Sequence, residues 1–240
     1  MVIIGSNSTS GNAARHLSES TQALQKSLGR LSSGSKLNSA SDDAAGTAVS
    51  MKFDAQIGRL QAAKDNIGNA ISFTQTQDGY LQKVSNALSR MSELSIAAQD
   101  GTKSATDLDA YDLEFQALDD MVQDMATKDF NGVSLFAGTA LKVTSDGNSN
   151  DTTGNFTATG VNLSTTIAGF AADTLQDVDA AESSYDNLQP AITALAADRS
   201  QVGANLSVLE GYSSTVSVLK DNISAANSRI SDVDVAEESA

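Results

Sequence analysis

Residues 195–230 read LAADRSQVGANLSVLEGYSSTVSVLKDNISAANSRI, the stretch that decides the fold. Apolar residues recur in it at a strict seven-residue spacing: Leu195, Val202, Leu209, Val216, Ile223 and Ile230. A heptad repeat of this length predicts one long helix with a narrow apolar seam, which needs a partner helix to cover it.

A second row with the same spacing predicts that the partner helix lies in the same chain. The row consists of Phe53, Leu60, Ile67, Thr74, Leu81 and Leu88. Two long helices that bear apolar seams, one towards each end of the sequence, predict a mainly α fold. We expect an elongated antiparallel helical bundle with a small β-hairpin region in the middle, a shape suited to assembly.

A shorter amphipathic helix is predicted near the start of the chain. Four leucines follow a helical spacing there: Leu17, Leu24, Leu28 and Leu31. Gly34 is predicted to end this helix, because glycine readily adopts a left-handed backbone. Residues 1–12 are rich in Ser, Asn and Gly and are predicted to precede it. Ser41 or Asp42 is then predicted to cap the long helix that runs to about residue 99.

The rest of the chain alternates between helical and β patterns. Apolar residues at helical spacing predict a third helix that starts at Ser104 or Thr106 and ends near residue 128. Residues 130–169 are rich in Thr, Ser, Asn and Gly and predict one or two β-hairpins. Residues 173–188 are again helical in pattern. Pro190 is expected to begin the final helix, although it could instead kink a continuous one.

These patterns predict five segments. Residues 1–41 hold the first helix and a linker, and residues 42–137 hold the first part of the helical core. Residues 138–172 form a short variable region, residues 173–234 hold the second part of the helical core, and residues 235–240 begin a C-terminal segment.

The composition disfavours an enzyme. The 240 residues include no Cys and a single histidine, His16, so disulfides, thiolate metal sites and Cys nucleophiles are absent from the sequence. No phosphate-binding glycine loop or paired catalytic carboxylates occur, and we predict no catalytic residue, cofactor or metal. The net charge of −15 repels nucleic acid and anionic lipid. We therefore predict neither nucleic acid nor membrane as a partner.

Three short motifs carry a resemblance to a known family. Residues 31–46 read LSSGSKLNSASDDAAG, residues 130–133 read FNGV, and residues 229–234 read RISDVD. All three closely resemble motifs of bacterial flagellins. The resemblance implies a structural subunit that forms a homopolymer, the flagellar filament, for motility. It also implies export through the flagellar type III machinery without a cleaved signal, growth beneath the filament cap, and location in the extracellular flagellum.

Two alternatives remain open at this level. The hook–filament junction protein shares both terminal regions, and Leu135-Phe-Ala-Gly-Thr139 favours it, whereas the DDAAG at residues 42–46 favours flagellin. Some flagellin-like proteins instead bind polysaccharide at the cell surface. A purely structural role and a glycan-binding role would be separated by a glycan-binding assay.

The resemblance also assigns residues to assembly. It places Leu24, Leu28 and Leu31 among the contacts of the terminal core helices. Flagellins usually continue past the RISDVD motif into a last apolar helix that pairs with the first one. Because this sequence ends at Ala240, it is either a C-terminally truncated chain or a protein with an unusual role. In either case we expect it to polymerise poorly by itself.

Finally, the resemblance implies recognition by the host's flagellin-sensing Toll-like receptor through Arg90, Leu94 and Glu114. Arg90 and Leu94 are four residues apart and share a helix face. The residues alone also fit a simpler interpretation, in which Arg90 pairs with Glu93 or Glu114 and Leu94 belongs to ordinary bundle packing.

Overall fold

The computed structural model describes residues 8–145, 155–170 and 173–239. In chain order the elements are α1 (Ser8–Ser33), α2 (Ala44–Ala98), α3 (Ala105–Ala126), β1 (Asp129–Phe130), β2 (Val133–Ser134), β3 (Leu141–Thr144), β4 (Asn155–Ala158), α4 (Leu163–Ile167), α5 (Val178–Ser231) and α6 (Val235–Glu238). The predicted mainly α fold with a small β region is confirmed. The chain forms two compact units: unit 1 holds the described residues of 1–61 and 218–240, and unit 2 holds the described residues of 62–217.

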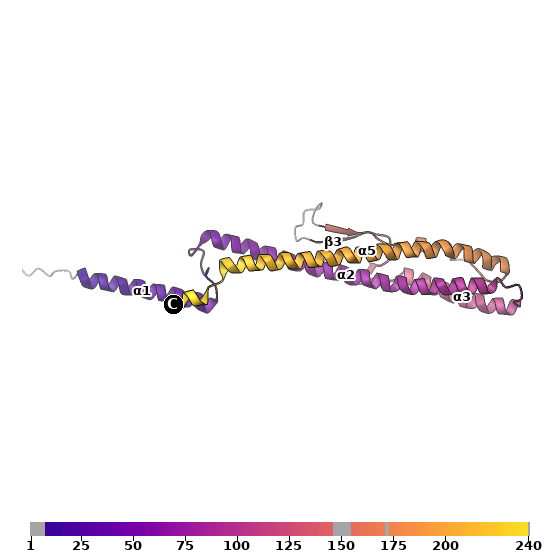
Figure 1. Cartoon of the computed structure of the whole chain (residues 1–240), viewed down its shortest axis with the longest axis horizontal. Coiled ribbons are helices and arrows are strands. Elements are labelled where there is room, and N and C mark those ends of the chain that lie inside the picture. The colour runs from indigo at the N-terminus through magenta and orange to yellow at the C-terminus, as the bar shows by residue number, and fades with distance from the viewer. Residues whose placement is uncertain (1–7, 146–154, 171–172, 240) are drawn as a thin grey trace, which may run out of the picture. The chain divides into compact units, whose positions relative to one another are not determined.

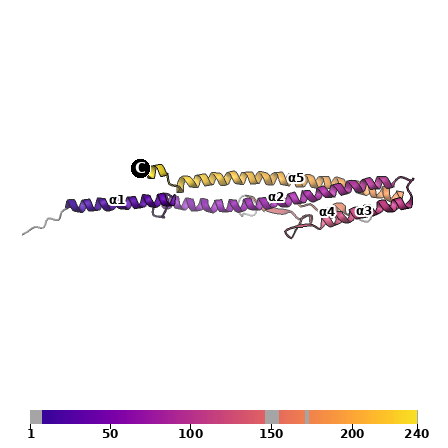
Figure 2. The same ribbon diagram turned by 90° about the horizontal axis from the view of Figure 1, so that it is seen from below.

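Within unit 2, the long helices α2 and α5 run side by side in opposite directions (Figure 1 and Figure 2). In unit 2, the Gln99 side chain just after α2 donates to the Ala181 carbonyl near the start of α5, at 3.4 Å. Further along, Arg199 Nε of α5 donates to Asp78 Oδ1 of α2 at 3.1 Å. From the first contact to the second, the residue numbers fall along α2 and rise along α5, so the two helices are antiparallel.

Most residues of the two heptad rows are buried, each within its own unit. The buried members are Leu60, Ile67, Thr74, Leu81, Leu88, Leu195, Val202, Leu209, Val216 and Ile223. Phe53 and Ile230, at the outer ends of the rows in unit 1, are half-buried. The seven-residue spacing therefore marks the side of each helix that faces its partner.

α3 adds a third helix to unit 2. Its N-terminus is fixed by a capping box: the Asp107 backbone N–H donates to Ser104 Oγ, and the Ser104 backbone N–H donates to Asp107 Oδ2 at 3.0 Å. Ser104, and not Thr106, is thus the residue that starts this helix. A cap of this kind stabilises a helix by about 1 kcal/mol.

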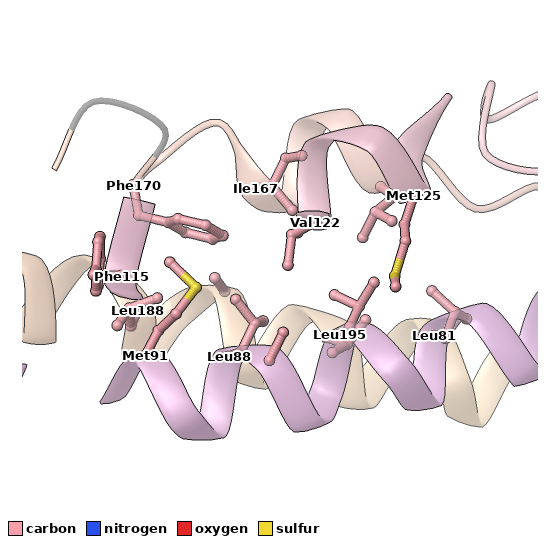
Figure 3. Close-up of a cluster of buried hydrophobic side chains, with 14 of the residues drawn as sticks. Leu81, Leu88, Met91, Phe115, Val122, Met125, Ile167, Phe170, Leu188 and Leu195 are labelled. Carbon is pink, nitrogen blue, oxygen red and sulfur yellow. The ribbon is translucent and has the colours of Figure 1, made fainter. Parts of the chain in front are cut away.

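The core of unit 2 lies where α2, α3, α4 and α5 meet. Figure 3 shows side chains from these elements directed towards one another. Its labelled members are Leu81, Leu88 and Met91 of α2, Phe115, Val122 and Met125 of α3, Ile167 of α4, Phe170, and Leu188 and Leu195 of α5. This cluster buries the apolar stripe that the sequence predicts for the third helix.

The middle region forms two antiparallel strand pairs, as the alternating pattern predicts. Phe130 pairs with Val133 across a tight turn, and β3 pairs with β4 in the register Val143 to Phe156. One hydrogen bond attaches this region to α2, because Gln77 Nε2 donates to the carbonyl of Leu135 at 2.6 Å. The region is therefore fixed to the helices of unit 2.

α4 was not expected, because its sequence Leu-Ser-Thr-Thr-Ile lies in a Thr- and Ser-rich segment that reads as β or loop. Asn162 caps it by accepting a hydrogen bond from the Thr165 backbone N–H. Leu163 and Ile167 are buried, so tertiary packing overrides the weak helix propensity of Thr and Ser.

The expected helix break at Pro190 is wrong. α5 begins at Val178 and continues through Pro190 to Ser231. A proline inside a helix costs about 3 kcal/mol, because it lacks an N–H and its ring crowds the preceding turn. Pro190 itself is exposed, while Leu188 and Ala191 beside it are 0% and 4% exposed. Burial of the opposite face of α5 outweighs this cost.

The first helix also differs from its expected start. α1 begins at Ser8, inside the segment of residues 1–12 that was predicted to precede it. The predicted end is confirmed: α1 stops at Ser33, and Gly34 has a φ of 69°. This left-handed conformation favours glycine, which has no Cβ to crowd the backbone.

Candidate functional site

The clearest exposed feature is an apolar stripe on α1 in unit 1. Leu17, Leu24 and Leu28 are 71%, 61% and 56% exposed, and Leu31 is half-buried. They share one face of the helix, because their spacings are seven, four and three residues. Such a row of large apolar side chains on a soluble surface indicates a site of interaction. We refer to these four leucines as the α1 stripe.

Backbone hydrogen bonds position α1 at the end of α5. The Lys36 N–H donates to the Ser231 carbonyl at 2.6 Å, and the Val233 N–H donates to the Gly34 carbonyl at 3.1 Å. Both contacts join the LSSGSKLNSASDDAAG motif to the RISDVD motif. Two motifs that are far apart in sequence thus build one junction, which holds α1 against α6.

Two ion pairs reinforce this junction. Lys26 Nζ lies 2.6 Å from Asp42 Oδ1, and Arg30 Nη1 lies 3.4 Å from Glu238 Oε1. The hydrogen bond from Lys26 lowers the pKa of the Asp42 carboxyl. Asp42 therefore attaches the segment between α1 and α2 to α1.

Asp43, and not Ser41 or Asp42, caps α2. Its Oδ1 accepts hydrogen bonds from the backbone N–H groups of Ala45 and Gly46, at 3.0 and 2.9 Å. A Cβ on residue 46 would lie only 2.6 Å from Asp43 Oδ2. The DDAAG sequence is thereby explained: the first acid pairs with Lys26, the second caps the helix, and glycine leaves room for the capping carboxylate.

Arg90 and Glu114 form an exposed bidentate ion pair between α2 and α3. Arg90 Nε and Nη2 donate to the two Glu114 oxygens at 2.7 and 3.1 Å, and Nη1 donates to Glu93 at 3.1 Å. The two carboxylates raise the pKa of Arg90, and the Arg90 guanidinium lowers the pKa of Glu114. Their side chains are about half exposed. Both are accessible to a binding partner.

Leu94 does not lie on that surface. It is 2% exposed and belongs to the core cluster of unit 2. It shares a helix row with Arg90, but the shorter side chain points into the interface with the other helices, while the Arg90 head reaches the surface. Leu94 is therefore not available as the apolar receptor contact that the resemblance implies. It belongs to the ordinary bundle packing, which was the simpler interpretation of the sequence.

Three further polar residues lay outside the sequence-based expectations. Arg30 and Glu238 are 208 residues apart, and no local pattern signals such a pair. Asp119 is 4% exposed, although it is a carboxylate. The sequence does contain a signal for the burial of Asp119, because this residue lies four residues after Phe115 and three before Val122, within the apolar stripe of α3.

The described residues give no sign of metal or membrane chemistry. No three His, Cys, Asp or Glu side chains among them are grouped as a metal ion would need. None of the described helices has the length and apolar character for crossing a bilayer.

Long paired helices and an exposed apolar stripe are typical of a helical structural protein that assembles with other chains. Comparison with known proteins agrees. A family model described as bacterial flagellin N-terminal helical region matches residues 4–140. A second, described as bacterial flagellin C-terminal helical region, matches residues 185–240.

Individual relatives cover nearly the whole chain. A flagellin of Halalkalibacterium halodurans is 34% identical across 99% of this chain and 88% of its own length. The flagellar filament 30.7 kDa core protein of Treponema maltophilum is 32% identical, with the same coverage. The crystal structure of Bacillus cereus flagellin aligns with a TM-score of 0.57 at 29% identity, over 68% of this chain and 94% of that one.

The chain belongs to the bacterial flagellin family and is a structural subunit of the flagellar filament. This answers the choice between flagellin and a hook–filament junction protein in favour of flagellin.

Proposed function

We propose that the chain joins other flagellin subunits through the α1 stripe. The observation that carries this proposal is the exposure of Leu17, Leu24 and Leu28, which no described element of unit 1 covers. Covering one exposed leucine contributes about 1.5–3 kcal/mol. Three such side chains on one helix face supply enough free energy for a specific helix–helix contact in a polymer.

The test is incorporation of labelled chain into filaments grown from flagellar seeds. The double variant Leu24→Ser/Leu28→Ser should incorporate about tenfold less than the unsubstituted chain, or worse. Leu113→Ser is the matched control, because Leu113 is 76% exposed but lies on α3 in unit 2. Equal incorporation by the double variant and the unsubstituted chain would overturn the proposal, with circular dichroism checking that both remain helical.

Export by the flagellar type III machinery and growth beneath the filament cap complete the proposed route. The three flagellin motifs support it, as does the absence of Cys, because a chain without disulfides can be threaded in an unfolded state. In a strain that lacks the flagellar export apparatus, the chain should remain in the cells. Its appearance in the medium of that strain would contradict this route.

Recognition by the host's flagellin-sensing Toll-like receptor is a further proposal, now carried by Arg90 and Glu114 without Leu94. An exposed arginine held in place by two carboxylates suits a binding hot spot, because its side chain is already ordered. Arg90→Ala should reduce receptor signalling at least tenfold. Arg59→Ala, which removes an exposed arginine elsewhere on α2, should leave it unchanged. Equal activity of both variants would refute the assignment of Arg90.

A further inference from the structure

The one deeply buried acid on α3 is poorly paired. Asp119 is 4% exposed, and its Oδ1 has no hydrogen-bond partner. Its Oδ2 accepts a single bond, from Gln123 Nε2 at 2.5 Å. An ionised carboxylate normally accepts several hydrogen bonds or pairs with a cation when it is buried. The geometry therefore suits a neutral carboxyl better than a charged one.

Apolar packing surrounds this carboxyl along the helix. Phe115 and Val122, one turn to either side of Asp119 on the same face of α3, are fully buried. Ile167 of α4 and Phe170 belong to the same cluster (Figure 3). Asp119 is therefore placed where α3 packs against the segment of residues 163–170.

Among the described residues, no cation is paired with this carboxyl. The charges that act on the Asp119 carboxyl belong to Asp120 of α3 and Asp173 of the segment before α5, and both are negative. α4 has no titratable side chain, and its Thr166 donates to Asp198 of α5 at 3.0 Å.

Two cations of α2, Arg90 and Lys83, are engaged or placed elsewhere. Arg90 is held by Glu114 and Glu93. Lys83 lines a surface groove with Leu118 and Met121, on another side of α3.

We propose that Asp119 is a proton-operated switch in unit 2: its protonated form lets α3 pack tightly against residues 163–170 and 173–175, and its ionised form loosens this contact. The proton is exchanged with solvent. Two hydrogen bonds report on the contact directly. The Leu175 N–H donates to Asp112 Oδ1 at 2.8 Å, and Gln116 Nε2 donates to the Asp173 carbonyl at 2.7 Å.

The direction of the pH effect follows from burial, which raises the pKa of Asp119. Between the ordinary pKa of aspartate, about 3.9, and this raised value, folded unit 2 holds a proton that the unfolded chain has lost. Its stability therefore decreases as the pH rises through that window. Asp173 and Asp198 also have pKa values raised by burial, and they add to the same trend.

The test compares the unsubstituted chain with Asp119→Asn between pH 4 and pH 7.5. Asparagine mimics the protonated carboxyl, so at pH 7.5 the variant should have an unfolding equilibrium constant about tenfold lower. Amide exchange at Leu175, corrected for its intrinsic pH dependence, should slow by a similar factor. Near pH 4 the two proteins should converge.

Asp109→Asn is the matched control, because it removes one carboxylate from an exposed position on the same helix. It should keep the pH dependence of the unsubstituted chain. If Asp119→Asn shows that same pH dependence, the proposal is overturned. A carboxyl-carbon titration of the unsubstituted chain decides the matter without any variant: an Asp119 that titrates at or below about 3.9 also overturns it.

Discussion

α1 and α2 carry leucines at the same helical spacings, yet most leucines of α1 are exposed and those of α2 are buried. Leu24 and Leu28 of α1 are more than half exposed, whereas Leu81 and Leu88 of α2 are fully buried. The pattern indicates which face of a helix is apolar, but the cover for that face comes from elsewhere in the chain or from another molecule. In unit 2, α3 and α5 supply the cover. In unit 1, α1 meets only the short α6 among the major element contacts.

The largest expected effect tests this difference directly. Leu81→Ala and Leu209→Ala should each lower the free energy of unfolding by about 2–5 kcal/mol, because both side chains are fully buried and would leave cavities. Leu24→Ala, the same change on α1, should alter it by less than about 0.5 kcal/mol. Urea unfolding followed by circular dichroism measures all three. Similar losses for Leu24→Ala and Leu81→Ala would remove the distinction between covered and uncovered helices.

Much of unit 2 could be predicted from the sequence, because its helices are long and their apolar residues strictly periodic. The heptad rows, a helix start at Ser104 and the strand pairs follow from local rules. Errors arose where packing overrides a local preference. Pro190 stays inside α5, and α4 forms in a Thr-rich segment, since buried neighbours hold both.

The candidate site was less predictable, because it depends on which side chains reach the surface. A spacing of four residues placed Arg90 and Leu94 on one face, but it could not reveal that neighbouring helices cover Leu94. The ion pair between Arg30 and Glu238 depends on a contact across the whole chain. Such contacts come from tertiary structure, which periodicity does not encode.

A second prediction concerns proline, which α5 tolerates only because it is packed. Pro190→Ala should restore a backbone hydrogen bond and raise the free energy of unfolding by about 1–3 kcal/mol. Gln189→Ala, at the exposed neighbouring position, should change it little. If Pro190→Ala leaves the free energy of unfolding unchanged, local bending of α5 already relieves the strain of the proline ring.

The reciprocal change belongs to α1. Gln22→Pro, at an exposed position in the middle of that helix, should abolish much of its helical signal, because α1 lacks the packing that compensates in α5. Far-ultraviolet circular dichroism measures the loss. The unfolding midpoint of unit 2 should stay where it is; a large shift would show that α1 supports unit 2.

A smaller effect is expected at the start of α2. Asp43→Ala should cost about 1 kcal/mol, because two backbone N–H groups lose their acceptor. Asp43→Asn should restore most of that loss, since the amide oxygen can accept the same bonds. Amide exchange at Ala45 and Gly46 locates the effect. If the alanine and asparagine variants lose equal stability, the carboxylate charge and not the cap is what matters there.

The smallest effect concerns the junction that holds α1. Lys26 lowers the pKa of Asp42, so the stabilisation from this pair is present above the ordinary aspartate pKa of about 3.9 and disappears as the pH falls through the lowered value. Lys26→Met should move the Asp42 pKa up towards the ordinary value, as a carboxyl-carbon titration would show. Global unfolding at neutral pH should hardly change, because Lys26 is about half exposed and an ion pair with a solvated partner contributes little. An Asp42 titration that is identical with and without Lys26 would mean that the linker alone, through the Ser39 N–H that donates to Asp42, sets the position of this carboxylate. The junction would then depend on its backbone hydrogen bonds, and α1 would be held by even fewer side-chain contacts than its exposed leucines suggest.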